Sequence, residues 1–267
     1  MANLRELTIV IKGAGEMASA VAWRLYMANF KKILMLETAH PLAVRRRVSF
    51  CEALHDGSQT VEGVQAIGVG AIGEIHAAWG QGRIAVAADP KWLLLQQVRP
   101  KVVVDAILAK KNLGTRMTDA ELVIGLGPGF TAGQDVHMII ETNRGHNLGR
   151  ILTNGSAQAN TGVPGAIAGY ARERVLRSPA TGHFQTTRSI GDLVKAEEAV
   201  GTVAGQKVTA RIDGALRGLM RSETKVTCGL KIGDVDPRGQ KEFCDTISEK
   251  ARAIGGSVLE AVLRVYN

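Results

Sequence analysis

The sequence predicts an α/β fold: a largely parallel sheet, then a β-rich module and a C-terminal helix. Over residues 7–126, apolar runs of strand length alternate with helical segments, the order typical of a parallel sheet covered on both faces. A glycine-rich turn joins the first of these strands to the first helix. From Gly182 onward, glycines and apolar residues recur at a constant offset of 32 residues, which predicts two copies of one β unit.

The composition indicates a protein that folds without covalent cross-links. Of the 267 residues, 45% are hydrophobic, enough to bury the cores of two modest domains without disulfides. The three cysteines have no CxxC spacing, so we expect neither a disulfide framework nor a metal site, and a reducing cytoplasm fits. There is no cleavable leader and no apolar run near the roughly 18 residues of a membrane span, so we expect a soluble protein.

Charge and aromatic content narrow the class of partner. The net charge of +8 favours anions of any kind, whether nucleic acid, a phosphorylated cofactor or an acidic protein. Aromatic residues make up only 4% of the chain and are not interleaved with basic stretches, so a stacking platform for single-stranded nucleic acid is not expected.

The first strand, turn and helix have the pattern of a nucleotide-binding turn. Residues 7–12 predict a strand and residues 18–28 predict a helix. Between them, Gly13, Gly15 and Ala18 form a GxGxxA sequence, in which glycine lets the backbone approach a ligand closely. The alternative is that these glycines only let the strand turn tightly into the helix.

The second strand adds an acidic residue at the expected distance. The apolar run over residues 33–36 ends in Glu37, whose carboxylate could accept a hydrogen bond from a ribose hydroxyl. We therefore predict a Rossmann-like ligand-binding domain over residues 1–150, with the GxGxxA turn and Glu37 as cofactor-binding residues.

Three adjacent arginines and a cysteine follow the second strand. On a helix, Arg45, Arg46 and Arg47 would spread over most of the circumference, so one or two could reach a phosphate-bearing ligand. We take Arg45 and Arg46 as cofactor-binding candidates. Cys51 follows in their positive field, which favours the thiolate, and is the candidate catalytic residue. The alternatives are a solvated charge run and a small buried cysteine.

An aspartate lies within one of the later strands. Residues 83–87 and 101–108 predict strands, separated by a helix over residues 91–98. Asp105 lies in the second of these apolar runs, where an unpaired carboxylate would be costly. It therefore either has a partner or points into a site at the carboxyl end of its strand, and we favour the site.

Residues 121–150 contain the densest group of candidate site residues. An apolar run predicts the last strand of the sheet, and the glycines after it expose backbone amides that can form a nest for an anionic ligand. The alternative is a glycine-rich turn followed by an exposed strand with solvated charges. The cofactor-binding residues predicted here are Gly127, Gly129, Thr131, Gly133, Asp135, Glu141, Arg144 and His146.

The second half of the chain predicts three segments. Residues 151–180, rich in Gly, Asn, Thr and Pro, predict a linker with a short helix over residues 167–175. Residues 181–240 form the β module, and residues 241–267 have the apolar spacing of a helix. The repeat in the β module matches Gly182 with Gly214, Phe184 with Leu216, Val194 with Val226, Val200 with Ile232, and Val203 with Val235.

This repeat resembles the barrel-sandwich hybrid of biotinyl and lipoyl domains. In those carriers the modified lysine lies in the hairpin that joins the two halves. The matching place here is Ala204 and Gly205, with Lys207 displaced towards the second half. The resemblance therefore implies the fold without a swinging arm.

Six segments of the chain together resemble the accessory proteins of selenium-dependent molybdenum hydroxylases, relatives of the xanthine dehydrogenase maturation factors. They are VIKGAGEMASAVAWRL, VVVDAILAKKN, GLGPGFTAGQDVH, IETNRGHNLGR, NTGVPG and KIGDVDPRG. The resemblance covers nearly the whole chain. It implies a Rossmann-like domain, a cytoplasmic maturation role, and handling of a molybdopterin-type cofactor, including its sulfur or selenium loading, before insertion into a client hydroxylase.

Two functions from different classes are compatible with these observations. The first is the maturation factor, which binds a molybdopterin-type cofactor and docks on a molybdenum hydroxylase. The alternative is an NAD(P)-dependent oxidoreductase that uses the GxGxxA turn and Glu37, although it leaves the glycine-rich stretch and the β module without a role. We expect the first, with a pterin or nucleotide ligand and no nucleic-acid or membrane partner. The sequence leaves open whether the chain is an enzyme and whether it forms a homo-oligomer.

Overall fold

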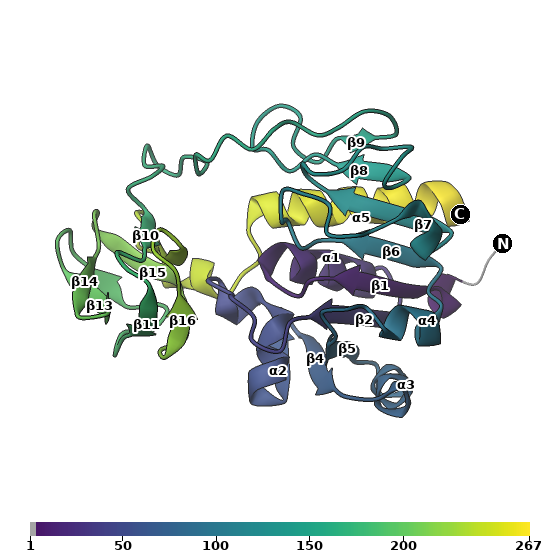
Figure 1. Ribbon diagram of the computed structural model, residues 1–267, viewed down its shortest axis with the longest axis horizontal. Helices are drawn as coiled ribbons and strands as arrows, with labels where there is room; N and C mark the ends of the chain where they lie inside the picture. Colours follow the sequence, from purple (N-terminus) through teal and green to yellow (C-terminus); the bar gives the residue numbers. More distant parts are fainter. Residues whose placement is uncertain (1–3) are drawn as a thin grey trace. The chain divides into compact units, whose positions relative to one another are not determined.

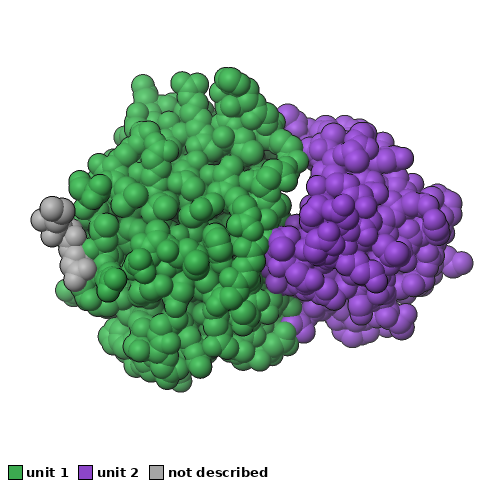
Figure 2. Space-filling view, turned by 180° about the vertical axis from the view of Figure 1, so that it is seen from behind, with its two compact units in different colours: residues 1–41, 49–160, 247–267 green, residues 42–48, 161–246 purple. Residues whose placement is uncertain are grey.

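The computed structural model describes residues 4–267 and has a mixed α/β architecture. It contains a nine-stranded sheet, two four-stranded antiparallel sheets and a long C-terminal helix. The chain forms two compact units, which Figure 2 shows in different colours. Unit 1 comprises residues 1–41, 49–160 and 247–267, and unit 2 comprises residues 42–48 and 161–246.

The sheet of unit 1 is parallel at its centre (Figure 1). Its spatial order is β3-β4-β5-β2-β1-β6-β7-β8-β9, in which neighbours from β4 to β8 run parallel. The two outermost pairs, β3 with β4 and β8 with β9, are antiparallel. The strands are β1 (Thr8–Lys12), β2 (Lys32–Glu37), β3 (Ser58–Val61), β4 (Val64–Val69), β5 (Ile84–Ala88), β6 (Val102–Asp105), β7 (Leu122–Leu126), β8 (Met138–Ile140) and β9 (Ile151–Leu152).

Two helices of unit 1 pack closely against each other. They are α1 (Glu16–Met27), which follows β1, and α5 (Glu249–Tyr266), which ends the chain. A Cβ atom on Gly255 of α5 would lie 2.9 Å from the carbonyl oxygen of Ala20 on α1, so glycine is what allows this close approach. The shorter helices are α2 (Ala53–Asp56), α3 (Ile72–Gly80) and α4 (Leu94–Val98).

The structure differs from the sequence prediction in two local elements. The strand predicted to be the last of the sheet, β7, is followed by β8 and β9 at the same edge. The helix predicted over residues 167–175 does not form. Ala168 has a φ of 47°, a left-handed conformation that interrupts a helix, and Val175 begins strand β10 instead.

The compact units also differ from the linear order of segments predicted from the sequence. Helix α5 belongs to unit 1, where it packs on α1. Residues 42–48 belong to unit 2, although they lie between two strands of unit 1 in the sequence. The backbone N–H of Leu219 donates to the carbonyl oxygen of Val44 at 2.8 Å, which adds this segment to the edge of a unit 2 strand.

Unit 2 contains two antiparallel sheets that share one apolar core. The strand orders are β10-β17-β15-β12 and β14-β13-β11-β16. The strands are β10 (Val175–Arg177), β11 (Gly182–Gln185), β12 (Leu193–Val194), β13 (Ala199–Val203), β14 (Gln206–Thr209), β15 (Gly214–Leu219), β16 (Thr224–Val226) and β17 (Lys231–Asp236).

The strand pairing of unit 2 follows the repeat seen in the sequence. At the 32-residue offset, β10 to β13 correspond to β14 to β17. β11 pairs with β13 of its own copy and with β16 of the other copy, while β15 pairs with β17 and β12. The apolar members of the matched pairs, such as Phe184 and Leu216, are all buried in the common core. Each sheet therefore contains strands from both copies.

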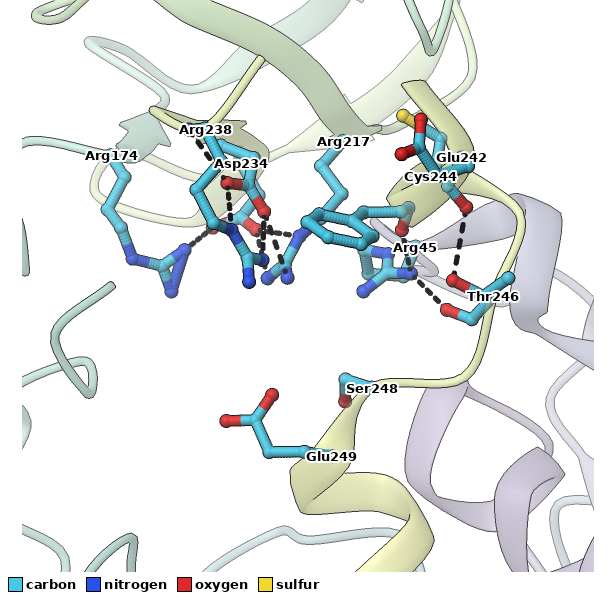
Figure 3. Close-up of polar contacts among 12 residues, drawn as sticks. Arg45, Arg174, Arg217, Asp234, Arg238, Glu242, Cys244, Thr246, Ser248 and Glu249 are labelled. Carbon is cyan, nitrogen blue, oxygen red and sulfur yellow. Dashed lines mark hydrogen bonds and ion pairs between the residues drawn. The ribbon is translucent and has the colours of Figure 1, made fainter. Parts of the chain in front are cut away.

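Two aspartates on β17 hold a network of arginines in unit 2 (Figure 3). The Oδ1 atom of Asp234 lies 2.7 Å from Nη1 of Arg174, and its Oδ2 atom lies 2.7 Å from Nη2 of Arg217. Asp236 pairs with Arg238 at 2.6 Å and with Arg217 at 3.3 Å. Both aspartates are fully buried, so each depends on these partners to remain charged.

The electrostatic balance of this network favours the charged carboxylates. Burial by itself raises the pKa of Asp234, but Lys231, Arg217 and Arg174 outweigh burial and hold that pKa below its ordinary value. Asp236 behaves in the same way: burial raises its pKa, but the hydrogen bonds from Arg238 and the charges of Arg217 and Arg238 outweigh burial and hold that pKa below its ordinary value.

We predict that Asp234→Asn destabilises the protein by about 3–5 kcal/mol at pH 7, because removing one partner leaves buried arginines without compensation. Since the pKa of Asp234 is lowered on folding, its contribution to stability is present above the unfolded pKa of about 3.9 and is lost as the pH falls below it. Urea unfolding at pH 7 and at pH 3.5 measures both effects. The matched control is Asp213→Asn, which removes an exposed ion pair with Lys195. An equal loss of stability in the two variants would contradict the prediction.

Candidate functional site

The candidate site lies at the carboxyl ends of the central parallel strands of unit 1. The chain leaves β1 through α1 and returns in β2 on one side of β1, whereas β6 lies on the other side. The loops that follow β1 and β6 therefore diverge at this point of the sheet, which is where ligands bind in open parallel sheets. The residues predicted at the ends of these strands, the GxGxxA turn, Glu37 and Asp105, come together here.

The three small residues of the turn have different surroundings. Gly13 has a φ of 96°, and a Cβ atom there would lie 3.2 Å from the carbonyl oxygen of Ala106 after β6. A Cβ atom on Gly15 would meet no protein atom within 4 Å, so this face of the turn is open. Ala18, in the first turn of α1, is buried. Gly15 is the N-cap of α1, and no side chain caps this end of the helix.

Glu37 at the end of β2 is bound to the turn itself. Its Oε2 atom accepts a hydrogen bond from the backbone N–H of Ala14 at 2.9 Å, and its Oε1 atom accepts from that of Thr38 at 2.8 Å. The side chain is partly exposed. Because each oxygen of a carboxylate can accept two hydrogen bonds, Glu37 keeps acceptor capacity on its exposed side.

The segment that contains Cys51 packs against the other side of the turn. The carbonyl oxygen of Ala14 accepts hydrogen bonds from the Cys51 backbone N–H at 2.9 Å and from the Ser19 hydroxyl at 3.0 Å. Ser19 in turn accepts from the Phe50 N–H at 2.7 Å. The thiol of Cys51 is fully buried, which is the surrounding that the packing alternative expects. Its role in catalysis stays a prediction.

Arg45 and Arg46 belong to unit 2, whereas the other predicted cofactor-binding residues belong to unit 1. Arg45 Nη2 donates to the carbonyl oxygens of Phe243 and Thr246, each at 2.9 Å (Figure 3). Arg46 Nε donates to the carbonyl oxygen of Leu219 at 2.8 Å. Arg45 is 4% exposed, so it is not part of a solvated charge run.

Lys12 is the most unusual charged residue of the site, and it is not among the residues predicted from the sequence. This last residue of β1 is fully buried, and its Nζ atom donates to Thr115 Oγ1 at 2.8 Å and pairs with Asp119 Oδ2 at 2.7 Å. The same atom lies 3.7 Å from the centroid of the Trp92 ring, a cation–π contact. The sequence feature that could have identified Lys12 is its position: a lysine that ends an apolar strand immediately before the GxGxxA turn.

One hydroxyl connects Lys12 to Asp105. Thr115 Oγ1 accepts from Lys12 and donates to Asp105 Oδ2 at 2.7 Å, while Asp105 Oδ1 accepts from the Ile107 N–H at 3.2 Å. Burial raises the pKa of the Asp105 carboxyl, and the hydrogen bond from Thr115 and the charge of Lys12 offset part of this rise. The arrangement can pass a proton from the Lys12 ammonium group to the Asp105 carboxylate through a single hydroxyl.

A cavity of about 550 Å³ lies beside this network. Trp92 and Asp119, which cover Lys12, form part of its wall, and the side of α4 forms another part. The remaining charged residues of the wall are mostly basic; they are Lys91, Arg99, Lys101, Arg116 and Glu121.

The glycines of the central stretch approach other parts of unit 1. A Cβ atom on Gly127 would lie 2.3 Å from the Thr142 hydroxyl, and one on Gly129 would lie 2.6 Å from the backbone nitrogen of Lys111. Both have a positive φ, of 74° and 114°. Gly133 also has a positive φ but faces open space. Contacts within the protein are therefore sufficient to require glycine at the first two positions.

The carboxylates of this stretch organise its backbone. Asp135 Oδ2 accepts from the Thr131 N–H at 2.8 Å. Glu141 is buried, and its two oxygens accept from the N–H groups of Asn143 and Gln158, each at 2.7 Å. These side chains close turns in the loop, so the structure gives each of them a role that requires no ligand.

Arg144 lies nearer to the glycine turn. Its guanidinium group pairs with Glu249 in the first turn of α5 at 2.7 Å, and the neighbouring Ser248 hydroxyl donates to Glu16 of α1 at 3.1 Å. The first turns of α1 and α5 therefore meet near Arg144. His146 follows in the same loop and is exposed. The ligand-binding roles of all these residues stay predictions.

No known family model matches the chain. A protein of Escherichia coli (strain K12), described as "Uncharacterized protein YqeB", is 48% identical over 259 residues, covering 97% of this chain and 48% of that protein. The chain therefore spans about half the length of this curated relative.

Among solved structures, the similarities are weak. An aspartoacylase family protein from Mesorhizobium loti matches 86% of this chain and 84% of its own at 14% identity, with a TM-score of 0.28. A succinylglutamate desuccinylase/aspartoacylase from Rhodobacter sphaeroides matches 33% of this chain and 30% of its own at 21% identity, with a TM-score of 0.23. At these TM-scores neither structure assigns a fold or an activity to this chain.

The comparisons correct the family and the function predicted from the sequence. The relative that covers nearly the whole chain is uncharacterized. Neither comparison leads to a maturation factor of molybdenum hydroxylases. The predicted membership of that family and the predicted maturation role are therefore wrong, and the oxidoreductase alternative has no more support.

None of the helices in residues 4–267 is both long and apolar enough to span a membrane. Within the same residues, no group of three His, Cys, Asp or Glu side chains is placed to hold a metal ion.

We predict that Asp105→Asn makes the protein more stable at pH 7 than the parent. Because folding raises the pKa of Asp105, its favourable contribution is present below the unfolded pKa and is lost as the pH rises through the folded pKa. As the pH rises from the unfolded pKa through the folded pKa of Asp105, the parent should therefore lose stability relative to the Asn variant. Thermal unfolding between pH 4 and pH 8 measures the difference.

The companion variant Thr115→Val removes a hydrogen bond that lowers the pKa of Asp105. We expect the carboxyl carbon of Asp105 to titrate at a higher pH in this variant by NMR. Two results would contradict these predictions: a lower titration midpoint of Asp105 in Thr115→Val, or a stability of Asp105→Asn relative to the parent that is lower at pH 8 than at pH 4. Either result would show that the charged form of Asp105 is favoured in the fold.

We predict that iodoacetamide modifies the exposed Cys228 in the folded protein, whereas the buried Cys51 and Cys244 react only after denaturation. Burial also raises the pKa of the Cys244 thiol, which slows its reaction further. Peptide mass spectrometry of alkylated protein distinguishes the three sites. If Cys51 reacts as fast as Cys228 in the folded protein, its thiol is accessible and the sequence-based catalytic role gains support.

Proposed function

We propose that unit 1 is a Rossmann-like domain that binds a nucleotide-type ligand at the carboxyl ends of β1 and β2, with a ligand phosphate at Gly15. The observation that carries the proposal is the division of roles among the three small residues of the turn. Gly13 is needed for the tight turn against the chain after β6, Gly15 faces open space, and Ala18 is buried in the first turn of α1. These are the three roles of the small residues in a dinucleotide-binding turn.

The first turn of α1 supports the same proposal. It has no side-chain cap, and backbone amides at the start of a helix favour an anionic group both by hydrogen bonding and by the helix dipole. The open face at Gly15 lets a phosphate approach these amides without meeting a Cβ atom.

Glu37 favours a ligand with a free ribose. The hydrogen bond from the Ala14 N–H holds its carboxylate against the turn, and its exposed side can accept from the ribose hydroxyls. A 2′-phosphate would place negative charge against this carboxylate. The proposed ligand is therefore of the NAD type rather than the NADP type, and the proposal concerns binding, not hydride transfer.

Unit 2 supports a scaffold or docking role. We infer that it is a barrel-sandwich hybrid, because strands are exchanged between two copies of one β unit. The hairpin between β13 and β14 has Ala204 and Gly205 at its tip, and Lys207 lies within β14. No lysine stands at the position that carries the swinging arm in biotinyl and lipoyl domains.

Isothermal titration of the purified protein with NAD⁺, NADP⁺ and AMP tests the proposed site. We expect NAD⁺ to bind more tightly than NADP⁺. In Gly15→Val, the new side chain occupies the place of the phosphate, and affinity should fall by at least about tenfold, or roughly 1.4 kcal/mol. Folding should be unaffected, because Gly15 has a φ of −74° and open space around its Cβ position.

The matched control is Gly73→Val, which also adds a side chain in open space but lies on α3. It should bind NAD⁺ as the parent does. Equal affinity of the Gly15→Val variant and the parent would place any nucleotide site elsewhere. A molybdopterin-type cofactor, the other ligand suggested by the sequence, is tested by mass spectrometry of small molecules released from protein purified from molybdate-replete cells.

A further inference from the structure

A second candidate binding site lies entirely within unit 2, in a cavity of about 290 Å³. We call it the arginine pocket, because three of its six lining residues are arginines. The lining consists of Gly162, Pro164, Arg172, Val175, Arg177 and Arg211. The described wall contains no acidic residue, in contrast to the arginine network around Asp234 and Asp236.

Local structure fixes the backbone of each arginine in the pocket. Arg177 is the last residue of β10, which pairs with β17. The Arg172 carbonyl oxygen accepts from the Val175 N–H at 3.1 Å, which closes a turn just before β10. Arg211 follows β14 and lies between the buried residues Ala210 and Ile212. Three positive charges are therefore held around one cavity by the fold.

The protein does not neutralise this charge within the cavity. Arg177 Nη1 donates to the carbonyl oxygen of Gly229 at 2.9 Å, which is a neutral acceptor. Within residues 4–267, the guanidinium groups of Arg172 and Arg211 have no hydrogen bond or salt bridge to a protein group. Arginine does not lose its proton in proteins, so the mutual repulsion persists at every physiological pH.

The acidic residues nearest in sequence are engaged elsewhere. Glu173 Oε2 accepts from the Ala171 N–H at 3.0 Å; its charge attracts the neighbouring Arg172 but forms no salt bridge with it. Asp213 pairs with Lys195 at 2.8 Å and accepts from the Ala196 N–H at 2.8 Å. Neither carboxylate lines the cavity.

We propose that the arginine pocket is a binding site for a compact phosphate-bearing ligand. A phosphate group carries the charge that relieves the repulsion, and its oxygens match the paired N–H donors of guanidinium groups. The cavity is at the lower end of the range of ligand pockets, about 300–1,000 Å³, so it fits a small phosphate compound rather than a dinucleotide. The proposal is independent of the nucleotide site in unit 1.

Calorimetric titration with three probes at constant ionic strength tests the arginine pocket: inorganic phosphate, pyrophosphate and ribose 5-phosphate. We expect binding of at least one probe, weakened by added NaCl because the interaction is between charges near solvent. The comparison between inorganic and organic probes shows whether the pocket takes a free phosphate or a phosphate monoester.

The double variant Arg172→Ala/Arg211→Ala should lose at least tenfold in affinity for that probe, and Arg172→Lys/Arg211→Lys should lose less, because lysine keeps the charge but not the paired donors. Both arginines are exposed, so circular dichroism and thermal unfolding should match the parent. Lys225→Ala, which removes an exposed charge from β16 outside the pocket, should bind as the parent does. The unit 1 variant Gly15→Val, which blocks the phosphate position proposed for unit 1, should still bind the probe at the arginine pocket.

Absence of binding by all three probes at millimolar concentration would overturn the proposal. It would be overturned equally if the double alanine variant bound as tightly as the parent, or if Lys225→Ala lost as much affinity as the double variant. The last result would show that the overall positive charge of the protein, not the pocket, attracts the anion.

Discussion

The burial of Lys12 is the constraint on which the candidate site of unit 1 depends. An ammonium group at the end of the central strand, fully removed from solvent, is tolerated only with compensating charge and hydrogen bonds. Asp119, Thr115 and the face of Trp92 supply them from two different loops. These loops are thereby held over the same edge of the sheet. The pairing of Lys12 also determines the surroundings of Asp105, which shares Thr115 with it.

The glycine turn next to Lys12 is held by the protein on one side and open on the other. On the closed side, Ala14 is bound by Glu37, Ser19 and the backbone of Cys51, so the conformation of the turn is determined before any ligand arrives. On the open side, Gly15 leaves the start of α1 accessible. A preorganised turn of this kind loses little conformational entropy when an anion binds. The central stretch differs, because its glycines are required by contacts within the protein.

The arginines of unit 2 fall into two groups, which differ in whether carboxylates compensate their charge. In the network around Asp234 and Asp236, buried carboxylates compensate the charges of the arginines. In the arginine pocket, the cations are exposed, and the nearby carboxylates pair with other groups. The same residue type is therefore structural at one place and available to a ligand at the other. The difference follows from burial, since an uncompensated charge can be tolerated only where water or a ligand reaches it.

The sequence by itself determined the features that depend on local pattern. The parallel strands with the GxGxxA turn follow from apolar runs and glycine spacing, and the repeat of the β module follows from matched positions such as Phe184 and Leu216. Only the tertiary structure decided which charged residues meet. Lys12 lies more than one hundred residues before Thr115 and Asp119 in the chain. Arg45 belongs to unit 2, where the backbone of its segment pairs with a strand of that unit. Ion pairs and close glycine contacts depend on distances across the fold, and these distances leave no periodic signal in the sequence.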